Sequence, residues 1–134
     1  MLGKKNTEFN SFDLNGKTIL IADDEYSVRF YYQEVYSDTG ATLILAKNGK
    51  EVIERYKSHP EIDIILMDMR MPECSGIEAT IEILKINPNA IILIQSASVS
   101  SEDRDAAITA GCLDYIGKPI NPEALIGVIR NHLK

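Results

Sequence analysis

Apolar residues occur in five short runs along this chain, separated by longer segments of mixed polarity. The runs cover residues 17–22, 41–46, 62–67, 90–95 and 112–116. Each is bounded by charged or turn-forming residues, which is typical of strands buried on both faces of a parallel sheet. The pattern therefore predicts five strands.

The segments between these runs have apolar residues at helical spacing. They predict helices at about 27–37, 49–58, 76–86, 102–110 and 122–132. Gly40 and Gly111 follow two of these helices as stop signals, and Pro122 lies in the first turn of the last. Strands that alternate with helices predict an α/β fold, with a parallel sheet covered by helices on both faces.

The apolar positions also predict which face of each helix is buried. We expect Ile108 to be the only large apolar anchor of the fourth helix, which would then be weakly held. The inward-facing residues expected for the first helix are Val28, Tyr31, Tyr32, Val35 and Tyr36, and those for the third are Ile77, Ile81 and Leu84.

Length and composition indicate one folded domain. The chain has 134 residues; residues 1–15 are polar and predict a flexible extension or linker, and residues 16–134 form the domain. The net charge of −6 disfavours direct binding to nucleic acid, and no apolar run approaches the length of a membrane span. We expect a cytoplasmic protein whose two cysteines, Cys74 and Cys112, are reduced; a redox role for Cys74 stays open.

Polar residues stand at the carboxyl ends of four of the expected strands. Asp23 and Asp24 follow the first, Asp68 the third, Ser96 the fourth and Lys118 the fifth. Taken singly, each has a plain explanation, such as an acid pair at a helix start, a loop serine or a lysine in a surface turn. Because open α/β sheets bind ligands beyond the carboxyl ends of their strands, the set together predicts a functional site.

Three carboxylates in one small site need a cation. If the first and third strands are neighbours, Asp23, Asp24 and Asp68 converge, and their hard oxygen atoms favour Mg²⁺. Asp68 could then act as a nucleophile toward a phosphoryl group, with Lys118 balancing its charge and Ser96 donating a hydrogen bond. The sequence has no glycine-rich nucleotide loop, so ATP bound by this domain is not the expected donor.

Four motifs together resemble those of the receiver domain of two-component response regulators, the CheY-like family. They are IADDE at 21–25, MDMRMP at 67–72 with Gly76 after it, SA at 96–97 and DYIGKP at 114–119. The resemblance covers about residues 17–133. It implies a three-layer, doubly wound, flavodoxin-like (βα)5 fold with strand order 2-1-3-4-5. It also implies a role in phosphorelay signal transduction.

The resemblance assigns a role to each site residue. Asp68 would be the phosphoacceptor, taking the phosphoryl group from a phosphohistidine on a histidine kinase or a histidine phosphotransfer protein. The Mg²⁺ ligands would be Asp23, Asp24, Asp68 and the backbone carbonyl of Arg70. Ser96 and Lys118 would contact the phosphoryl group.

The resemblance also implies how the signal is passed on. Tyr115 would be an aromatic switch that turns inward when Ser96 moves, and the Lys118–Pro119 bond is expected to be cis. The surface of the fourth helix, fifth strand and fifth helix would then change for a downstream output domain or protein. Independently of the resemblance, Tyr26 and Phe30 lie beside the acid pair and off the apolar stripe of the first helix, so they are candidates for docking the phosphohistidine partner. That they are ordinary scattered surface aromatics is an equally open interpretation.

Other interpretations stay open. A phosphorylation-independent interaction module on the same fold is the main alternative, and a Mg²⁺-dependent metabolite phosphatase is a weaker one. The lead-in at 14–20 is similar to that of receivers in hybrid sensor kinases, while a stand-alone regulator is equally compatible. We expect no enzyme activity beyond the domain's own aspartyl phosphorylation and dephosphorylation, and a monomer or weak homodimer.

Overall fold

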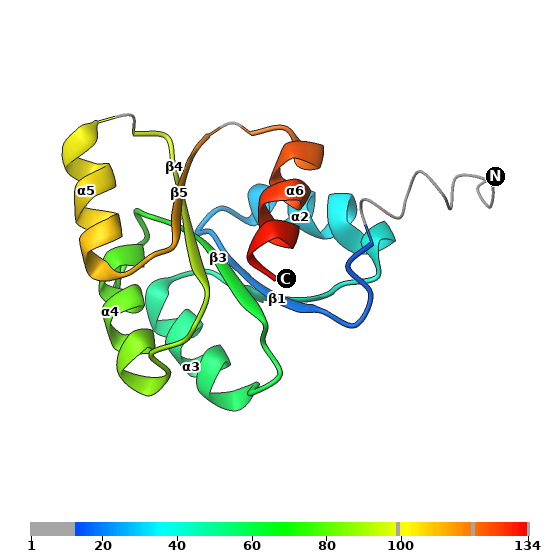
Figure 1. Cartoon of the computed structure of the whole chain (residues 1–134), viewed down its shortest axis with the longest axis horizontal. Coiled ribbons are helices and arrows are strands. Elements are labelled where there is room, and N and C mark those ends of the chain that lie inside the picture. Colours follow the sequence, from blue (N-terminus) through cyan, green and yellow to red (C-terminus); the bar gives the residue numbers. More distant parts are fainter. Residues whose placement is uncertain (1–12, 99, 119, 134) are drawn as a thin grey trace.

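The computed structural model describes residues 13–98, 100–118 and 120–133. Five strands alternate with helices along the chain (Figure 1). The strands are β1 (Thr18–Ala22), β2 (Thr42–Ala46), β3 (Ile64–Asp68), β4 (Ile92–Ser96) and β5 (Asp114–Gly117). The helices are α2 (Tyr26–Tyr36), α3 (Gly49–Ser58), α4 (Gly76–Ile86), α5 (Ser101–Ala110) and α6 (Pro122–His132), with a short 3₁₀ helix, η3 (Ser37–Thr39), after α2.

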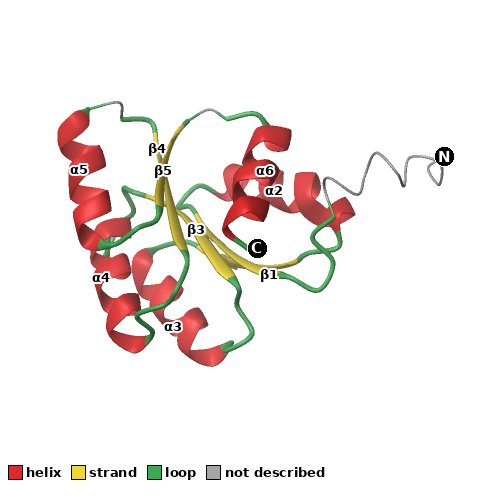
Figure 2. Ribbon diagram, in the orientation of Figure 1, coloured by secondary structure: helices red, strands yellow, loops and turns green. Residues whose placement is uncertain are grey.

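The five strands form one parallel sheet in the order β2-β1-β3-β4-β5. Helices α3, α4 and α5 cover one face of the sheet, and α2 and α6 cover the other (Figure 2). This is the three-layer, doubly wound arrangement that the alternation of strands and helices predicts. The predicted fold class and strand order are confirmed.

A hydrophobic core lies on each face of the sheet. Alternate residues of each strand enter opposite cores, so that Ile92 and Ile94 pack toward α4 and Leu93 packs toward α6. The central strands are buried apart from Asp68 at the end of β3, whereas β2 at the edge is largely half-exposed. The two cores hold the strands rigidly, so the residues at their carboxyl ends are held in fixed relative positions.

Side-chain caps begin four of the helices. The side chains of Asn48, Ser75, Ser100 and Asn121 accept hydrogen bonds from backbone N–H groups in the first turns of α3, α4, α5 and α6. At α4, the Glu78 carboxylate also accepts from the backbone of Ser75, which completes a capping box. Such local signals make the helix starts predictable from sequence.

The predictions of which residues of the first and third helices face the core were partly wrong. Ile81 and Tyr31 are about half-exposed, and α4 instead buries Ala79, Thr80 and Ile83. Thr80 tolerates burial because its hydroxyl donates to the carbonyl of Gly76 at 2.8 Å, so no polar atom is left unpaired.

Two further expectations are corrected. In α5, Ile108 is exposed and Ala107 makes the buried contact, so the helix has an even smaller anchor than predicted. Leu14, which we placed in the extension 1–15, is 2% exposed and donates its N–H to the carbonyl of Thr39. The packed domain therefore begins before the predicted boundary at residue 16; residues 1–12 lie outside the described part. Among the helices described, none combines the length and the hydrophobicity that crossing a bilayer requires.

Candidate functional site

Three carboxylates meet at the carboxyl edge of the sheet. Asp23 follows β1 and Asp68 ends β3, and these strands are hydrogen-bonded neighbours in which Ala22 pairs with Met67. One carboxylate oxygen each of Asp23, Asp24 and Asp68 lies within 4.8 Å of the other two. Asp23 is buried, Asp68 is half-buried and Asp24 is exposed, so the cluster opens to solvent on one side.

Lys118 reaches into this cluster from the end of β5. Its ammonium donates to Oδ2 of Asp23 at 2.9 Å and lies 3.4 Å from Oδ1 of Asp68. Its backbone N–H donates to the carbonyl of Ser96 at 2.8 Å, which ties β5 to the end of β4. Four strand ends, far apart in sequence, thus contribute to one site.

The surroundings of Asp68 favour its protonated form. Burial raises the pKa of Asp68; the ammonium of Lys118 opposes this effect, and the charges of Asp23 and Asp24 add to it. Burial alone would lower the pKa of Lys118, but its hydrogen bond to Asp23 and the charges of Asp68 and Asp23 raise it overall. Lys118 therefore stays protonated, and its charge only partly offsets the effects that raise the pKa of Asp68.

Backbone contacts fix Asp23. Its N–H donates to the carbonyl of Ala46 at 3.1 Å, and its carbonyl accepts from the Arg29 guanidinium at 2.7 Å. Its side-chain Oδ1 accepts from the N–H of Glu25 at 3.0 Å. Together these bonds hold the buried carboxylate so that Oδ2 faces Lys118.

Gly76 sets the position of Asp68. A side chain at residue 76 would place its Cβ 2.5 Å from the carbonyl oxygen of Asp68, closer than real Cβ atoms approach such a neighbour. The N–H of Gly76 donates to the carbonyl of Met69 at 2.8 Å. The absence of a side chain thus lets the first turn of α4 pack against the end of β3.

The carboxylate cluster fits a divalent cation with oxygen ligands. Mg²⁺ binds oxygen at about 2.0–2.1 Å, so two of its ligands are at most about 4.2 Å apart. The cluster spans up to 4.8 Å, so small side-chain rotations would bring its oxygens into range. Its formal charge of −3 is offset, among the described residues, by the ammonium of Lys118, which leaves a negative excess that also favours a cation. Asp23, Asp24 and Asp68 would hold it.

Ser96 and Tyr115 occupy the adjoining strands. Ser96 ends β4, follows the register partner of Asp68 and is 3% exposed; its hydroxyl oxygen accepts from the N–H of Ser98 at 3.0 Å. The ring of Tyr115 lies inward, 8% exposed, and its hydroxyl donates to the carbonyl of Ser98 at 3.2 Å. Both side chains thus contact the same loop; their movement stays a prediction.

The remaining predicted residues have mixed outcomes. The guanidinium of Arg70 pairs with Asp103 of α5 at 2.8 Å, and a metal contact by its carbonyl stays a prediction. Tyr26 and Phe30 are 72% and 51% exposed on α2, with ring centroids 6.3 Å apart. The predicted cis bond involves Pro119, which lies outside the described residues.

Sequence reasoning missed two features of the site. One is the direct ion pair between Lys118 and Asp23. The other is a buried hydrogen bond from the Tyr32 hydroxyl to Oε1 of Gln95. A polar residue at the end of an otherwise apolar strand was the available signal for Gln95, but its partner lies 63 residues away and had no local signature.

The fold and this edge of the sheet define the class of protein. A five-stranded doubly wound sheet carries three acids and a lysine at the carboxyl ends of β1, β3 and β5, and the response regulator receiver domain family matches residues 19–130. The chain belongs to this family, and it is a CheY-like receiver domain.

Individual members of the family show how similar the chain is to known receiver proteins. It is 39% identical to the chemotaxis protein CheY of Thermotoga maritima over 83% of this chain and 92% of that protein. It is 28% identical to hybrid signal transduction histidine kinase I of Dictyostelium discoideum over 99% of this chain but only 8% of that protein. The CheY-containing structure of a CheX-CheY-BeF3-Mg²⁺ complex from Borrelia burgdorferi superposes with a TM-score of 0.80 and 27% identity, covering 88% of this chain and 90% of that one.

Proposed function

We propose that this domain is a working phosphoacceptor: it takes a phosphoryl group from a phosphohistidine onto Asp68, with Mg²⁺, and passes the signal through the surface of α5, β5 and α6. The donor would be a histidine kinase or a histidine phosphotransfer protein in the cytoplasm. The observation that carries the proposal is the convergence of Asp23, Asp24, Asp68 and Lys118 within one cluster.

The chemistry follows from the positions of these groups. An oxygen of Asp68 attacks the phosphorus, the P–N bond of the phosphohistidine breaks, and its electron pair returns to the imidazole nitrogen, which leaves neutral imidazole after protonation. Lys118 offers its ammonium to the phosphoryl oxygens, and Ser96 offers its hydroxyl. A Mg²⁺ ion held by the three carboxylates would neutralise charge on the same oxygens.

The solved structure of a relative includes both Mg²⁺ and BeF3, which is an analogue of the phosphoryl group. The Borrelia burgdorferi structure contains CheY with BeF3 and Mg²⁺ in a complex with CheX. By analogy, the present domain would take these ligands at its carboxylate cluster. We propose no turnover of a separate substrate: the domain would promote only its own phosphorylation and dephosphorylation.

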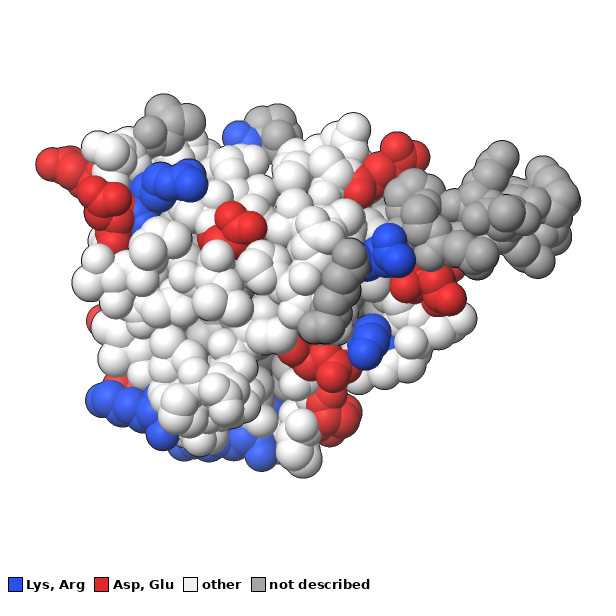
Figure 3. Space-filling view, viewed as in Figure 1, with Lys and Arg blue, Asp and Glu red and all other residues white. Residues whose placement is uncertain are grey.

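The output surface would be α5, β5 and α6. Phosphorylation adds about −1.5 to −2 charge and would attract Ser96 and Lys118, which sit directly before the loops that enter α5 and α6. Ile108 and Leu113 are about half-exposed on this side. Figure 3 shows a mostly uncharged area in the middle of this face, with an acidic side chain inside it and most other charged side chains nearer its rim. Such an area suits a downstream protein or output domain.

The donor would dock beside the acid cluster on α2. Tyr26 and Phe30 are exposed and stacked, and the Arg29 guanidinium lies 5.8 Å from the Tyr26 ring centroid. Aromatic side chains that cost little conformational entropy are effective interface anchors. Phe30→Ala is expected to slow transfer from a phosphohistidine protein without altering phosphorylation by acetyl phosphate; equal slowing of both reactions would contradict a docking role.

Incubation with acetyl phosphate and Mg²⁺, followed by intact mass measurement, tests the acceptor role. Wild type is expected to gain one phosphoryl group and Asp68→Ala none. A gain of equal size in Asp68→Ala would place the acceptor elsewhere. No gain in either protein, with no binding of beryllofluoride, would favour the alternative of a phosphorylation-independent interaction module.

A further inference from the structure

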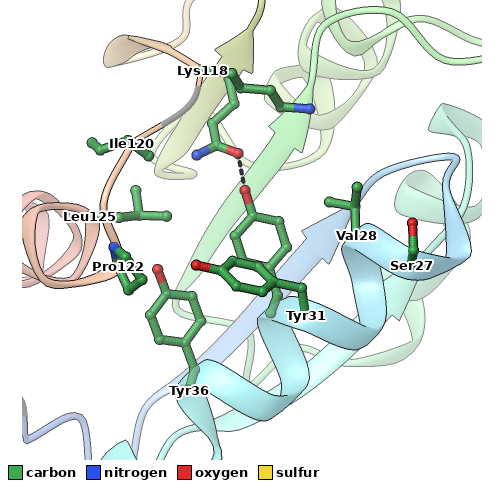
Figure 4. A pocket seen from close by; sticks show the side chains of 10 residues that line it. Ser27, Val28, Tyr31, Tyr36, Lys118, Ile120, Pro122 and Leu125 are labelled. Atoms are coloured by element: carbon green, nitrogen blue, oxygen red, sulfur yellow. Dashed lines mark hydrogen bonds between the residues drawn. The ribbon is translucent and has the colours of Figure 1, made fainter.

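A pocket lies on the α2 and α6 face of the sheet, beside the carboxylate cluster. Its volume is about 300 Å³. Figure 4 shows side chains of α2 on one side of the pocket and Ile120, Pro122 and Leu125 on the other. Lys118 also lines it, so the pocket adjoins the phosphoacceptor site without being part of it.

The polar end of the pocket contains an unpaired donor. Gln95 lines the pocket, is only 2% exposed, and uses its side-chain oxygen to accept from the hydroxyl of Tyr32. Within the described residues, its buried amide nitrogen has no hydrogen-bond partner. An amide N–H buried without a partner is costly and rare. The nitrogen is closed to a water-sized probe in this structure, so a ligand acceptor would reach it through a small shift of the lining side chains and would then be strongly favoured.

Apart from Ser27 and Lys118, the rest of the lining is aromatic or aliphatic. Tyr31 and Tyr32 contribute rings from one turn of α2 and Tyr36 from the next, and Val28 and Leu125 contribute aliphatic surface. Figure 4 shows the rings of Tyr31 and Tyr36 directing their hydroxyl ends toward the segment that carries Ile120 and Pro122. Apolar walls with one or a few convergent polar groups are typical of small-molecule sites, and this volume is at the lower end of their range.

The charges nearby restrict the ligand to a neutral molecule. Lys118 is the pocket's one charged lining residue among those described, and its ammonium is already paired with Asp23 and lies near Asp68. An anion in the pocket would meet the negative potential of the carboxylate cluster, whereas a cation would lie against the ammonium.

We propose that this pocket binds a small neutral aromatic molecule whose single hydrogen-bond acceptor, such as a ketone oxygen, pairs with the side-chain amide N–H of Gln95. The aromatic ring packs between the tyrosines of α2 and the apolar residues that begin α6. Its size is that of one substituted ring, because the pocket has no room for a nucleotide or a peptide.

Acetophenone and indole are matched probes for this site. They have the same number of non-hydrogen atoms, but acetophenone carries only an acceptor and indole only a strong N–H donor. Each is titrated into ¹⁵N-labelled protein, and the Gln95 side-chain amide and the backbone amides of α2 and 120–125 are followed by NMR. Acetophenone is expected to give saturable shifts with millimolar affinity, and indole to bind at least about fivefold more weakly.

Variants separate the hydrogen bond from the cavity. Gln95→Leu is expected to weaken acetophenone binding about tenfold and leave indole binding unchanged, because it removes the donor at similar side-chain volume. Val28→Phe fills the pocket and should abolish binding of both probes. Ile81→Phe, a matched insertion of a ring on α4 at the other face, should change neither.

Three results would overturn the proposal. They are equal affinity of wild type for the two probes, unchanged acetophenone binding in Gln95→Leu, and no saturable shift at the pocket, which would leave it as a site for water only. If Gln95→Leu does not fold, the proposal is tested by the affinities of acetophenone and indole for wild type and for Val28→Phe.

Discussion

Gly76→Ala tests whether the packing of α4 against β3 positions Asp68, the proposed phosphoacceptor. The added Cβ would lie 2.5 Å from the carbonyl oxygen of Asp68, 3.1 Å from Cα of Met69 and 3.3 Å from the carbonyl carbon of Asp68. All three atoms belong to the backbone, so no side-chain rotation relieves the contact. Either α4 or the end of β3 must move.

The size of the movement follows from the contact distance. A separation of at least 3.0 Å is needed, and 3.0 minus 2.5 gives a shift of at least 0.5 Å. Overpacking of this kind costs about 1–3 kcal/mol of stability. Since a misplacement of about 1 Å at a reacting group costs on the order of 100-fold in rate, half of that shift should slow phosphorylation about tenfold.

Gly49→Ala is the matched control. Gly49 also begins a helix, α3, and its added Cβ would lie 2.3 Å from the carbonyl oxygen of Cys74, a backbone clash of similar severity. This clash falls on the loop after β3 and not on Asp68. The stability cost should therefore be similar, about 1–3 kcal/mol, with a much smaller effect on phosphorylation.

Two measurements separate these effects. Urea unfolding gives the free energy of unfolding, and intact mass during incubation with acetyl phosphate and Mg²⁺ gives the phosphorylation rate, at a temperature where both variants are folded. The reasoning fails if Gly76→Ala is destabilised but phosphorylated at the wild-type rate. It also fails if Gly49→Ala slows the reaction as much as Gly76→Ala does.

Four further predictions concern charge, metal, helix propensity and switching. Burial and the neighbouring carboxylates raise the pKa of Asp68 above its usual 3.8, so the folded state keeps this proton to higher pH than the unfolded chain. The stability of the metal-free protein should fall as pH rises from 3.8 through the raised pKa, and Asp68→Asn should lack this fall. A difference in Tm between wild type and Asp68→Asn that does not change with pH would contradict this prediction. Mg²⁺ should raise the Tm of wild type, and a tenfold loss of affinity in Asp24→Asn should remove about 1.4 kcal/mol of that effect at saturation; an equal rise in both would exclude Asp24 as a ligand. Gly127→Ala adds a Cβ with nothing within 4 Å inside α6, so urea unfolding should show a gain of about 0.5–1 kcal/mol, and a loss would refute this. Ser96→Ala should still accept the phosphoryl group but lose the NMR shifts of Tyr115 and α5 that beryllofluoride causes in wild type; unaltered shifts would show that Ser96 does not transmit the signal.

The sequence predicted the fold because its signals are local. Five apolar runs and the helical spacing between them sufficed for the strand and helix pattern, and caps such as Asn48 and Ser75 marked helix starts. The face of α4 was not predictable in this way. Its buried Thr80 reads as polar in sequence, and only its bond to the carbonyl of Gly76 makes burial acceptable.

The site was predictable only as a set of strand ends. A parallel sheet brings carboxyl ends to one edge, so Asp23, Asp68 and Lys118 could be grouped without knowing their contacts. Pairings across the sheet could not be derived, because the Lys118–Asp23 contact spans 95 residues and the Tyr32–Gln95 contact spans 63. Such contacts depend on which helix packs over which strand, which hydrophobic periodicity does not specify.

The charge of the cluster indicates how the proposed switch would work. Three carboxylates and one ammonium leave a formal charge of −2, which a divalent cation would cancel. Phosphorylation of Asp68 would then replace one negative charge by about −1.5 to −2, which would draw the ammonium of Lys118 from Asp23 toward the phosphoryl oxygens. Because the backbone N–H of Lys118 is bonded to the carbonyl of Ser96, a backbone shift at this lysine would also move the end of β4. The ion pair seen here is therefore the element whose rearrangement would carry the signal from Asp68 to α5 and α6.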